Sequence, residues 1–238
     1  MGKILNIETS TRVCSVALAV DGKTIALQES NTESSHARQI TVFAEQIMYK
    51  SGFTFQDLDA IAVSKGPGSY TGLRIGVSTA KGFCYSLDKP LISVGTLTSL
   101  ANGMILKLAV EGKTPVDFLF CPMIDARRME VYTAVYDSRL HEVRKVLAEV
   151  IDENSFFDFF RQKKPLIFVG DGAAKCKEIL SKVSPNTIFR EEFLASATYM
   201  APLAEDKLKA GDFEDTAYFE PFYLKDFVAG IPHVKGLR

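Results

Sequence analysis

The chain reads ILNIETSTRVCSVALAVDGKTIALQE over residues 4–29. Three segments of this stretch, residues 4–8, 13–20 and 23–29, are apolar or alternate apolar with polar residues, as β-strands do. Asp21-Gly22 separates the last two segments. This dipeptide suits a two-residue hairpin turn because both central residues adopt positive φ. The chain is therefore expected to begin with a three-stranded meander.

Alternating helices and strands are expected after the meander. Residues 36–51 carry apolar side chains at helical spacing, and Gly52 ends the pattern. A strand is expected at residues 59–63, followed by a glycine-rich turn, a helix at 71–86 and an apolar strand at 90–94. The predicted order of the first half is βββαβαβ.

The second half repeats this order. Strands are expected at residues 117–124, 129–136, 141–149 and 165–169, and helices at 153–162 and 173–182. Such alternation is common in α/β domains, so order alone leaves an unduplicated domain open. Two hairpin-led βββαβα units are, however, the architecture of the actin-like, sugar-kinase and Hsp70 superfamily (ASKHA, RNase H-like). The sequence thus predicts a two-lobed α/β fold of that kind. In that superfamily ATP binds between the lobes, so the question is whether this chain kept the ATP site.

A boundary between the lobes is expected near Glu111-Gly112-Lys113, the exposed end of a helix predicted at residues 98–114. This assigns residues 1–108 to a first lobe that would bind a partner. Residues 109–238 form the second lobe, with a C-terminal helix at 196–210 and an aromatic tail.

The composition limits what the chain does by itself. A formal net charge of −1 and a pI near 6.3 give no overall attraction to phosphate, so a nucleic-acid role needs a local basic patch or a partner. No run approaches the ~20 apolar residues of a membrane span. The four cysteines form no CxxC pair and lie in apolar stretches, as buried thiols of a reducing compartment do: Cys14, Cys84, Cys121 and Cys176. A cytoplasmic protein is expected.

Residues 64–76 read SKGPGSYTGLRIG, a strand-to-helix turn rich in glycine. Backbone N–H groups at a helix start bind anions. The spacing matches neither the Walker pattern nor GxGxxG after a strand, so phosphate binding by this loop is disfavoured.

The same stretch places Gly72, Gly76 and Ala80 four residues apart, so one face of the helix has almost no side chains. A glycine inside a helix costs roughly 1 kcal/mol relative to alanine, which suggests that something packs closely there. Two packing surfaces are open: a partner helix, or the sheet or preceding helix of the same lobe.

The chain resembles the bacterial TsaB (YeaZ) family. The resemblance is carried by ILNIETS at 4–10, CSVAL at 14–18, SHAR at 35–38, GPGSYTGLRIG at 66–76 and DARRMEVY at 125–132. It implies a non-catalytic scaffold subunit of the machinery that makes threonylcarbamoyladenosine (t6A) in tRNA. Its implied partners are the catalytic paralogue TsaD and the ATPase TsaE, and tRNA would be reached only through the complex.

The resemblance also implies a helix-packed partner surface on the first lobe. The expected interface residues are Gln39, Phe43, Gly72, Leu73, Gly76, Val77 and Ala80. Gly76→Leu would then block the partner in a folded protein, whereas an unfolded variant would favour internal packing. The same face would allow a homodimer when TsaD is absent.

No catalytic residue, metal or cofactor is expected. The three histidines, His36, His141 and His233, are far apart in sequence and form no HxxxH or HExxH pair. Where superfamily ATPases have aspartate and glycine in each phosphate hairpin, this chain has Glu8-Thr9-Ser10 and Asp125-Ala126-Arg127-Arg128. Glu8 and Asp125 are candidates for a carboxylate pair, and an ion pair with Arg127 or Arg128 is the plainer expectation. Attraction of a phosphate by these arginines stays open.

The rival functions are an autonomous ATP-dependent enzyme such as a small-molecule kinase, an inactive peptidase-like protein, and a self-associating structural protein. Four phenylalanines, Phe156, Phe157, Phe159 and Phe160, exceed one helical face, so either core packing or an exposed contact is possible there.

Overall fold

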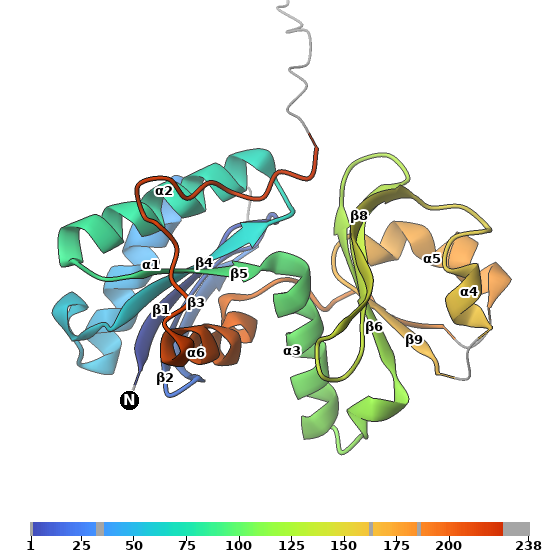
Figure 1. Ribbon diagram of the computed structural model, residues 1–238, viewed down its shortest axis with the longest axis horizontal. Helices are drawn as coiled ribbons and strands as arrows, with labels where there is room; N and C mark the ends of the chain where they lie inside the picture. Colours follow the sequence, from blue (N-terminus) through green and yellow to red (C-terminus); the bar gives the residue numbers. More distant parts are fainter. Residues whose placement is uncertain (1, 32–35, 162–163, 185–186, 226–238) are drawn as a thin grey trace, which may run out of the picture.

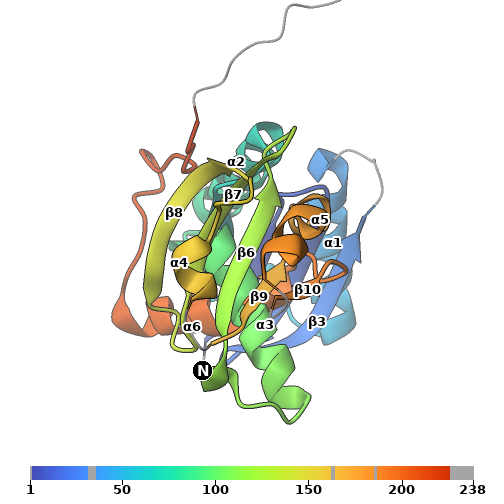
Figure 2. The same cartoon turned by 90° about the vertical axis from the view of Figure 1, so that its right-hand side faces the viewer.

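A computed structural model describes residues 2–31, 36–161, 164–184 and 187–225. It has two α/β lobes side by side (Figure 1). Viewed from the second lobe, α4 and α5 lie in front of strands β6 and β9 (Figure 2).

The first lobe is built on a mixed sheet in the order β3-β2-β1-β4-β5. Antiparallel pairing joins β1, β2 and β3, and parallel pairing joins β1, β4 and β5. Helices α1 and α2 cover the face that carries Leu5 and Ile7. The bounds are β1 Lys3–Glu8, β2 Cys14–Val20, β3 Lys23–Ser30, α1 His36–Ser51, η1 Phe55–Asp57, β4 Ala60–Gly66, α2 Tyr70–Leu87 and β5 Leu91–Gly95.

The second lobe repeats this topology in the order β8-β7-β6-β9-β10, which confirms the predicted duplication. Its fifth strand was not predicted, because β10 has only three residues and all three are half-buried. The bounds are η2 Pro115–Asp117, β6 Leu119–Asp125, β7 Glu130–Tyr136, β8 Glu142–Val150, α4 Phe157–Phe160, β9 Leu166–Val169, α5 Ala173–Val183 and β10 Ile188–Arg190.

The helix that follows each sheet packs on the sheet of the other lobe. Helix α3 (Thr96–Val110) lies between the sheets and joins a core with Phe120 and Ile167 of the second lobe (Figure 1). Helix α6 (Ala201–Ala210), preceded by η3 (Ala197–Met200), covers Ile4 and its neighbours on the first sheet. The two lobes therefore share their inner helices.

Ser15 and Ser196 form hydrogen bonds that attach η3 to the first lobe. The Ala197 backbone N–H donates to Ser15 Oγ over 3.0 Å, and Ser196 Oγ donates to Glu29 Oε2 over 2.9 Å. These bonds connect the last part of the chain to the first β-meander.

Residues 212–225, here called the C-terminal strap, also return to the first lobe. Glu214 forms a β-bridge with Leu91 of β5. Phe219 packs against the first-lobe core that lies between the sheet and helices α1 and α2. The Phe222 backbone N–H donates to the Lys65 carbonyl over 2.7 Å. Figure 1 shows the strap running along α2.

Packing contacts cross the proposed boundary between residues 1–108 and 109–238. Helix α3 packs against the second sheet, whereas α6 and the strap pack against the first. Residues 226–238 lie outside the described part of the chain.

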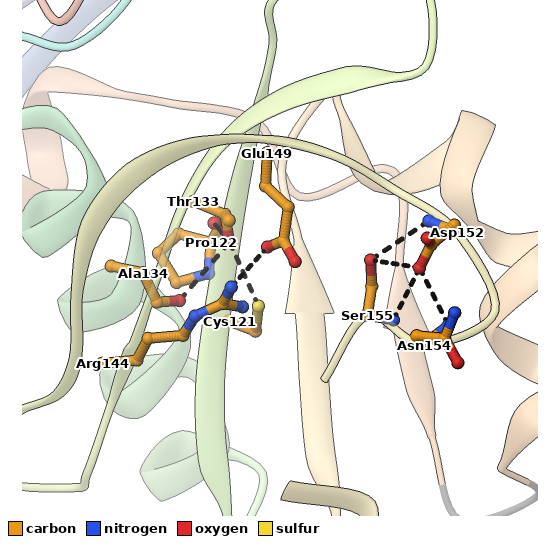
Figure 3. A network of polar contacts seen from close by, with 9 residues as sticks. All are labelled: Cys121, Pro122, Thr133, Ala134, Arg144, Glu149, Asp152, Asn154 and Ser155. Carbon is orange, nitrogen blue, oxygen red and sulfur yellow. Dashed lines mark hydrogen bonds and ion pairs between the residues drawn. The ribbon is translucent and has the colours of Figure 1, made fainter. Parts of the chain in front are cut away.

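Helix α4 is a single turn because the chain before it forms a tight turn. Asp152 Oδ1 accepts from the backbone N–H groups of Asn154 and Ser155 over 2.8 and 3.0 Å (Figure 3). Phe156 then adopts a left-handed φ of 62°. The helix predicted at residues 153–162 therefore begins only at Phe157.

The phenylalanines around α4 mostly serve the core of the second lobe. Phe156 is buried, and Phe159 and Phe160 pack against the same cluster, whereas Phe157 is exposed. The Arg144 guanidinium lies 4.8 Å from the Phe156 ring centroid. It also lies 2.8 Å from Glu149 Oε2 (Figure 3). Core packing therefore accounts for three of the four rings.

Candidate functional site: the interlobe hairpins and the outer helices

The glycine-rich turn before α2 packs on the β1–β2 hairpin of its own lobe. The Ser69 backbone N–H donates to the Ser10 carbonyl over 2.6 Å, and Thr9 Oγ1 donates to the Gly72 carbonyl over 2.8 Å. A Cβ on Gly72 would overlap the Thr9 carbonyl, and one on Gly76 would overlap Thr9 Oγ1. These glycines allow the close approach of α2 and Thr9.

The structure places the predicted interface residues as follows. Five of them are buried within the first lobe: Gly72, Leu73, Gly76, Val77 and Ala80. Gln39 and Phe43 are half-buried on α1. Internal packing therefore explains why α2 carries Gly72 and Gly76, and the open question of what packs on them is answered by Thr9.

A different face of α1 and α2 is exposed. Tyr49 on α1 is 88% exposed and Tyr85 on α2 is 91% exposed, and Val42 is also exposed. Gly82 lies on the exposed side of α2, and a Cβ there would meet no atom within 4 Å. Packing within the lobe therefore gives no reason for this glycine. The four-residue spacing missed Gly82, which is six residues after Gly76.

The first interlobe hairpin, residues 8–14, uses its backbone N–H groups internally. The Ser10 N–H donates to Glu8 Oε1 over 2.7 Å, and the Val13 N–H donates to Thr11 Oγ1 over 3.2 Å. The Glu8 side chain is fully buried. Burial raises the pKa of Glu8, because desolvation outweighs the hydrogen bonds from Ser10.

The second interlobe hairpin, residues 125–130, also binds its own side chains. The Asp125 N–H donates to Asp171 Oδ1 over 3.0 Å, and the Arg127 N–H donates to Asp125 Oδ1 over 2.7 Å. Lys175 Nζ pairs with Asp125 and donates to the carbonyls of Arg128 and Glu130 over 2.7 Å each. In both hairpins, carboxylates of the chain accept N–H bonds of the kind that a phosphate would accept.

The first hairpin interacts electrostatically with Asp171 of the second lobe, in the turn between β9 and α5. Burial raises the pKa of Asp171, and the nearby charge of Arg12 acts in the opposite direction. The expected pairing of Glu8 or Asp125 with Arg127 or Arg128 is not found among the described residues. Asp125 instead pairs with Lys175 of its own lobe.

Arg127 and Arg128 both have left-handed backbones, with φ of 70° and 51°. This conformation costs residues other than glycine roughly 1–2 kcal/mol each. Both side chains are exposed, and within the described part of the chain neither guanidinium has a hydrogen bond or ion pair.

The histidines do not converge in the described residues. His36 Nε2 lies 2.9 Å from the Thr11 carbonyl, and His141 Nδ1 lies 3.1 Å from Asp137 Oδ2. His233 lies outside the described residues. Among residues 2–31, 36–161, 164–184 and 187–225, no group of three or more His, Cys, Asp or Glu is arranged to hold a metal. In the same ranges, no helix has the length and apolar character to cross a membrane.

Comparison with known proteins identifies the family. The model of the family described as TsaD, tRNA N6-adenosine threonylcarbamoyltransferase, matches residues 28–233. The tRNA threonylcarbamoyladenosine biosynthesis protein TsaB of Escherichia coli strain K12 is 31% identical over 234 residues, covering 95% of this chain and 96% of that protein. The chain belongs to the TsaB family. The resemblance of its sequence motifs to TsaB is thereby confirmed.

Solved structures agree with the TsaB fold. YeaZ from Pseudomonas aeruginosa has a TM-score of 0.77 at 23% identity, covering 94% of this chain and 100% of that chain. The activator of 2-hydroxyisocaproyl-CoA dehydratase from Clostridium difficile, solved with bound ADPNP, has a TM-score of 0.51 at 10% identity, covering 88% and 97%. At these identities the likeness shows the fold alone, and the predicted ASKHA fold class is confirmed.

Proposed function

We propose that this TsaB-family chain is a non-catalytic subunit of the cytoplasmic machinery that makes threonylcarbamoyladenosine in tRNA. It binds and supports the catalytic subunit TsaD, acts together with TsaE, and reaches tRNA as part of that complex. Membership of the TsaB family supports the pathway, because the relatives are described as threonylcarbamoyladenosine biosynthesis proteins.

One observation carries the non-catalytic assignment. Backbone N–H groups of both interlobe hairpins donate to the chain's own carboxylates, at Glu8, Asp125 and Asp171. A phosphate held in the first hairpin would have to displace the carboxylate of Glu8, which is fully buried and would lose its hydrogen bond without gaining water. In the second hairpin it would have to compete with Asp125 and Asp171 for N–H groups that are already bonded. The rival function, an autonomous ATP-dependent enzyme of the same fold, requires such a phosphate site and is disfavoured for this reason.

The exposed face of α1 and α2 is the proposed surface for TsaD. It is defined here by Val42 and Tyr49 of α1 and by Ser78, Gly82 and Tyr85 of α2, and is called the outer helix face. Large rings beside small residues let a partner helix come close while the rings bury apolar area. The buried glycines Gly72 and Gly76 contribute indirectly by seating α2 on Thr9.

The test compares Gly82→Leu and Tyr85→Ala with Val110→Ser, whose side chain is 89% exposed on α3. Each variant is mixed with TsaD of the same organism, and complex formation is measured by size-exclusion chromatography with light scattering. Loss of the complex with the α2 variants, but not with Val110→Ser, is expected.

Two controls are needed: circular dichroism of the variants, and complex formation by the unsubstituted chain. Circular dichroism must show that Gly82→Leu is folded, as expected for a position with open space around it. Full complex formation by folded Gly82→Leu and Tyr85→Ala would exclude the outer helix face. Absence of any complex with the unsubstituted chain would contradict the subunit role itself.

A further inference from the structure

The tip of the β6–β7 hairpin presents two adjacent arginines to solvent. The side chains of Arg127 and Arg128 are exposed and, within the described residues, have no hydrogen bond or ion pair. The overall charge of the chain is −1, so this is a local concentration of positive charge rather than a general property of the protein.

The hairpin tip is braced in its left-handed conformation. The Ala126 N–H donates to the Glu130 carbonyl over 3.1 Å, and the Glu130 N–H donates to the Arg127 carbonyl over 3.1 Å. Lys175 Nζ, from the first turn of α5, donates to the carbonyls of Arg128 and Glu130. Non-glycine residues keep a left-handed backbone only where the surrounding structure enforces it, and such sites cluster at ligand contacts.

Aromatic and basic side chains of the first lobe border this tip. Lys225 of the strap pairs with Glu130, and Tyr223, two residues earlier, packs on Tyr70 with ring centroids 4.9 Å apart. The Arg74 guanidinium lies 4.9 Å from the Tyr70 ring centroid. The two tyrosine rings are half-buried and tilted by 39° to each other. Cations beside aromatic rings are a combination with which proteins bind RNA strands, because phosphates contact the cations and bases contact the rings.

We infer that Arg127 and Arg128 bind backbone phosphates of the RNA substrate, an inference that rests on the proposed function. An RNA is favoured over a free nucleotide because the backbone N–H groups beside the arginines are already bonded to Asp125 and Asp171. A small phosphate would therefore find guanidinium groups but no backbone cradle. A strand of RNA presents several phosphates in a row, which exposed guanidinium groups can bind without backbone N–H donors.

The test compares R127Q/R128Q with the matched double variant R139Q/K145Q. Both remove two positive charges, and Arg139 and Lys145 are exposed in the β7–β8 turn and on β8, at the other end of β7. Binding of a tRNA transcript to the complex of the full chain with TsaD is measured by fluorescence anisotropy at several salt concentrations.

R127Q/R128Q is expected to weaken tRNA binding about 10-fold at low salt and to reduce the slope of log affinity against log salt by about 1 to 2. R139Q/K145Q is expected to leave affinity within about 2-fold and the slope unchanged. An unchanged affinity and slope for R127Q/R128Q in an intact complex would overturn the inference while leaving the proposed function standing.

Other outcomes separate the alternatives. Loss of the TsaD complex by folded R127Q/R128Q would show that the hairpin binds protein, and loss of ATP or ADP binding with unchanged tRNA binding would show a nucleotide site. Both overturn the inference. If the unsubstituted chain forms no complex with TsaD, the proposed function fails. In that case, tRNA binding is measured with the isolated chain instead. Equal tRNA affinities of R127Q/R128Q and R139Q/K145Q would then overturn the inference.

Discussion

The side chain of Thr9 occupies the space beside Gly76 into which a Cβ at that position would project. Thr9 Oγ1 donates to the Gly72 carbonyl over 2.8 Å, one helical turn earlier. The two glycines are therefore a requirement of the fold of the first lobe, because any larger residue would push α2 away from the β1–β2 hairpin.

Gly76→Ala is expected to lower the free energy of unfolding by about 1–3 kcal/mol, because the added methyl group overpacks the contact with Thr9. Gly82→Ala, on the exposed side of the same helix, is expected to raise it by about 0.5–1 kcal/mol, because alanine is the better helix former. Urea unfolding of both variants measures the difference. Similar effects of the two substitutions would contradict the assigned roles.

Glu8→Gln is expected to change how stability depends on pH. The pKa of Glu8 is raised in the folded protein by burial, so stability from the neutral acid is fully present below the unfolded-state value near 4.5. It is lost as pH rises through the raised folded-state pKa. The Glu8→Gln side chain does not titrate. The free energy of unfolding of this variant, relative to that of the unsubstituted protein, should therefore increase as the pH rises above 4.5.

Urea unfolding between about pH 4.5 and pH 8 tests this, with Glu8→Gln and the exposed Glu142→Gln compared to the unsubstituted chain. A constant difference between Glu8→Gln and the unsubstituted chain over that range would show that Glu8 does not carry the pH dependence.

The C-terminal strap should stabilise the first lobe through Phe219. Phe219→Ala is expected to lower the free energy of unfolding by about 1–3 kcal/mol, since the half-buried ring packs against the first-lobe core beneath α1 and α2. Lys225→Ala should cost less than about 1 kcal/mol, because its pair with Glu130 is partly solvated. Phe222→Ala is the matched aromatic control, because Phe222 holds the strap through its backbone N–H. Equal losses from Phe219→Ala and Phe222→Ala would count against this role.

The cysteines should not react in the folded protein. All four are buried and free, and burial raises the pKa of Cys14 and Cys84 to about 12 and that of Cys176 to about 11. Burial also raises the pKa of Cys121. Labelling with a thiol reagent near pH 8 should therefore be at least about 1,000-fold slower in the folded than in the unfolded chain, because little thiolate is present and access is blocked. A fast-reacting thiol would indicate that one of these cores opens.

The sequence was sufficient for features that are encoded locally. Strand β2 follows from its apolar run and the Asp21-Gly22 turn from turn chemistry, and the predicted helix at residues 36–51 coincides with α1. The duplication followed from the repeated order of elements. The sequence of α3 also indicated its position between the two sheets. Its apolar residues lie all around the helix axis, as expected for a helix that is covered on both sides.

Features set by contacts far apart in sequence could not be predicted. The contact between Thr9 and Gly76, the return of the strap to β5, and the pairing of Lys225 with Glu130 each join segments that are remote in the chain. The spacing of Gly72, Gly76 and Ala80 correctly indicated close packing but carried no information about which surface packs there. Gly82 was missed because it stands outside that spacing.

The most direct measurement is a tRNA modification assay with TsaD, TsaE, ATP, tRNA and a supply of threonylcarbamoyl-adenylate, performed with this chain, without it, and with this chain alone. We predict threonylcarbamoyladenosine only when this chain and TsaD are both present, and none from this chain by itself. Full modification without this chain, or modification by this chain alone, would contradict its role as a required non-catalytic subunit.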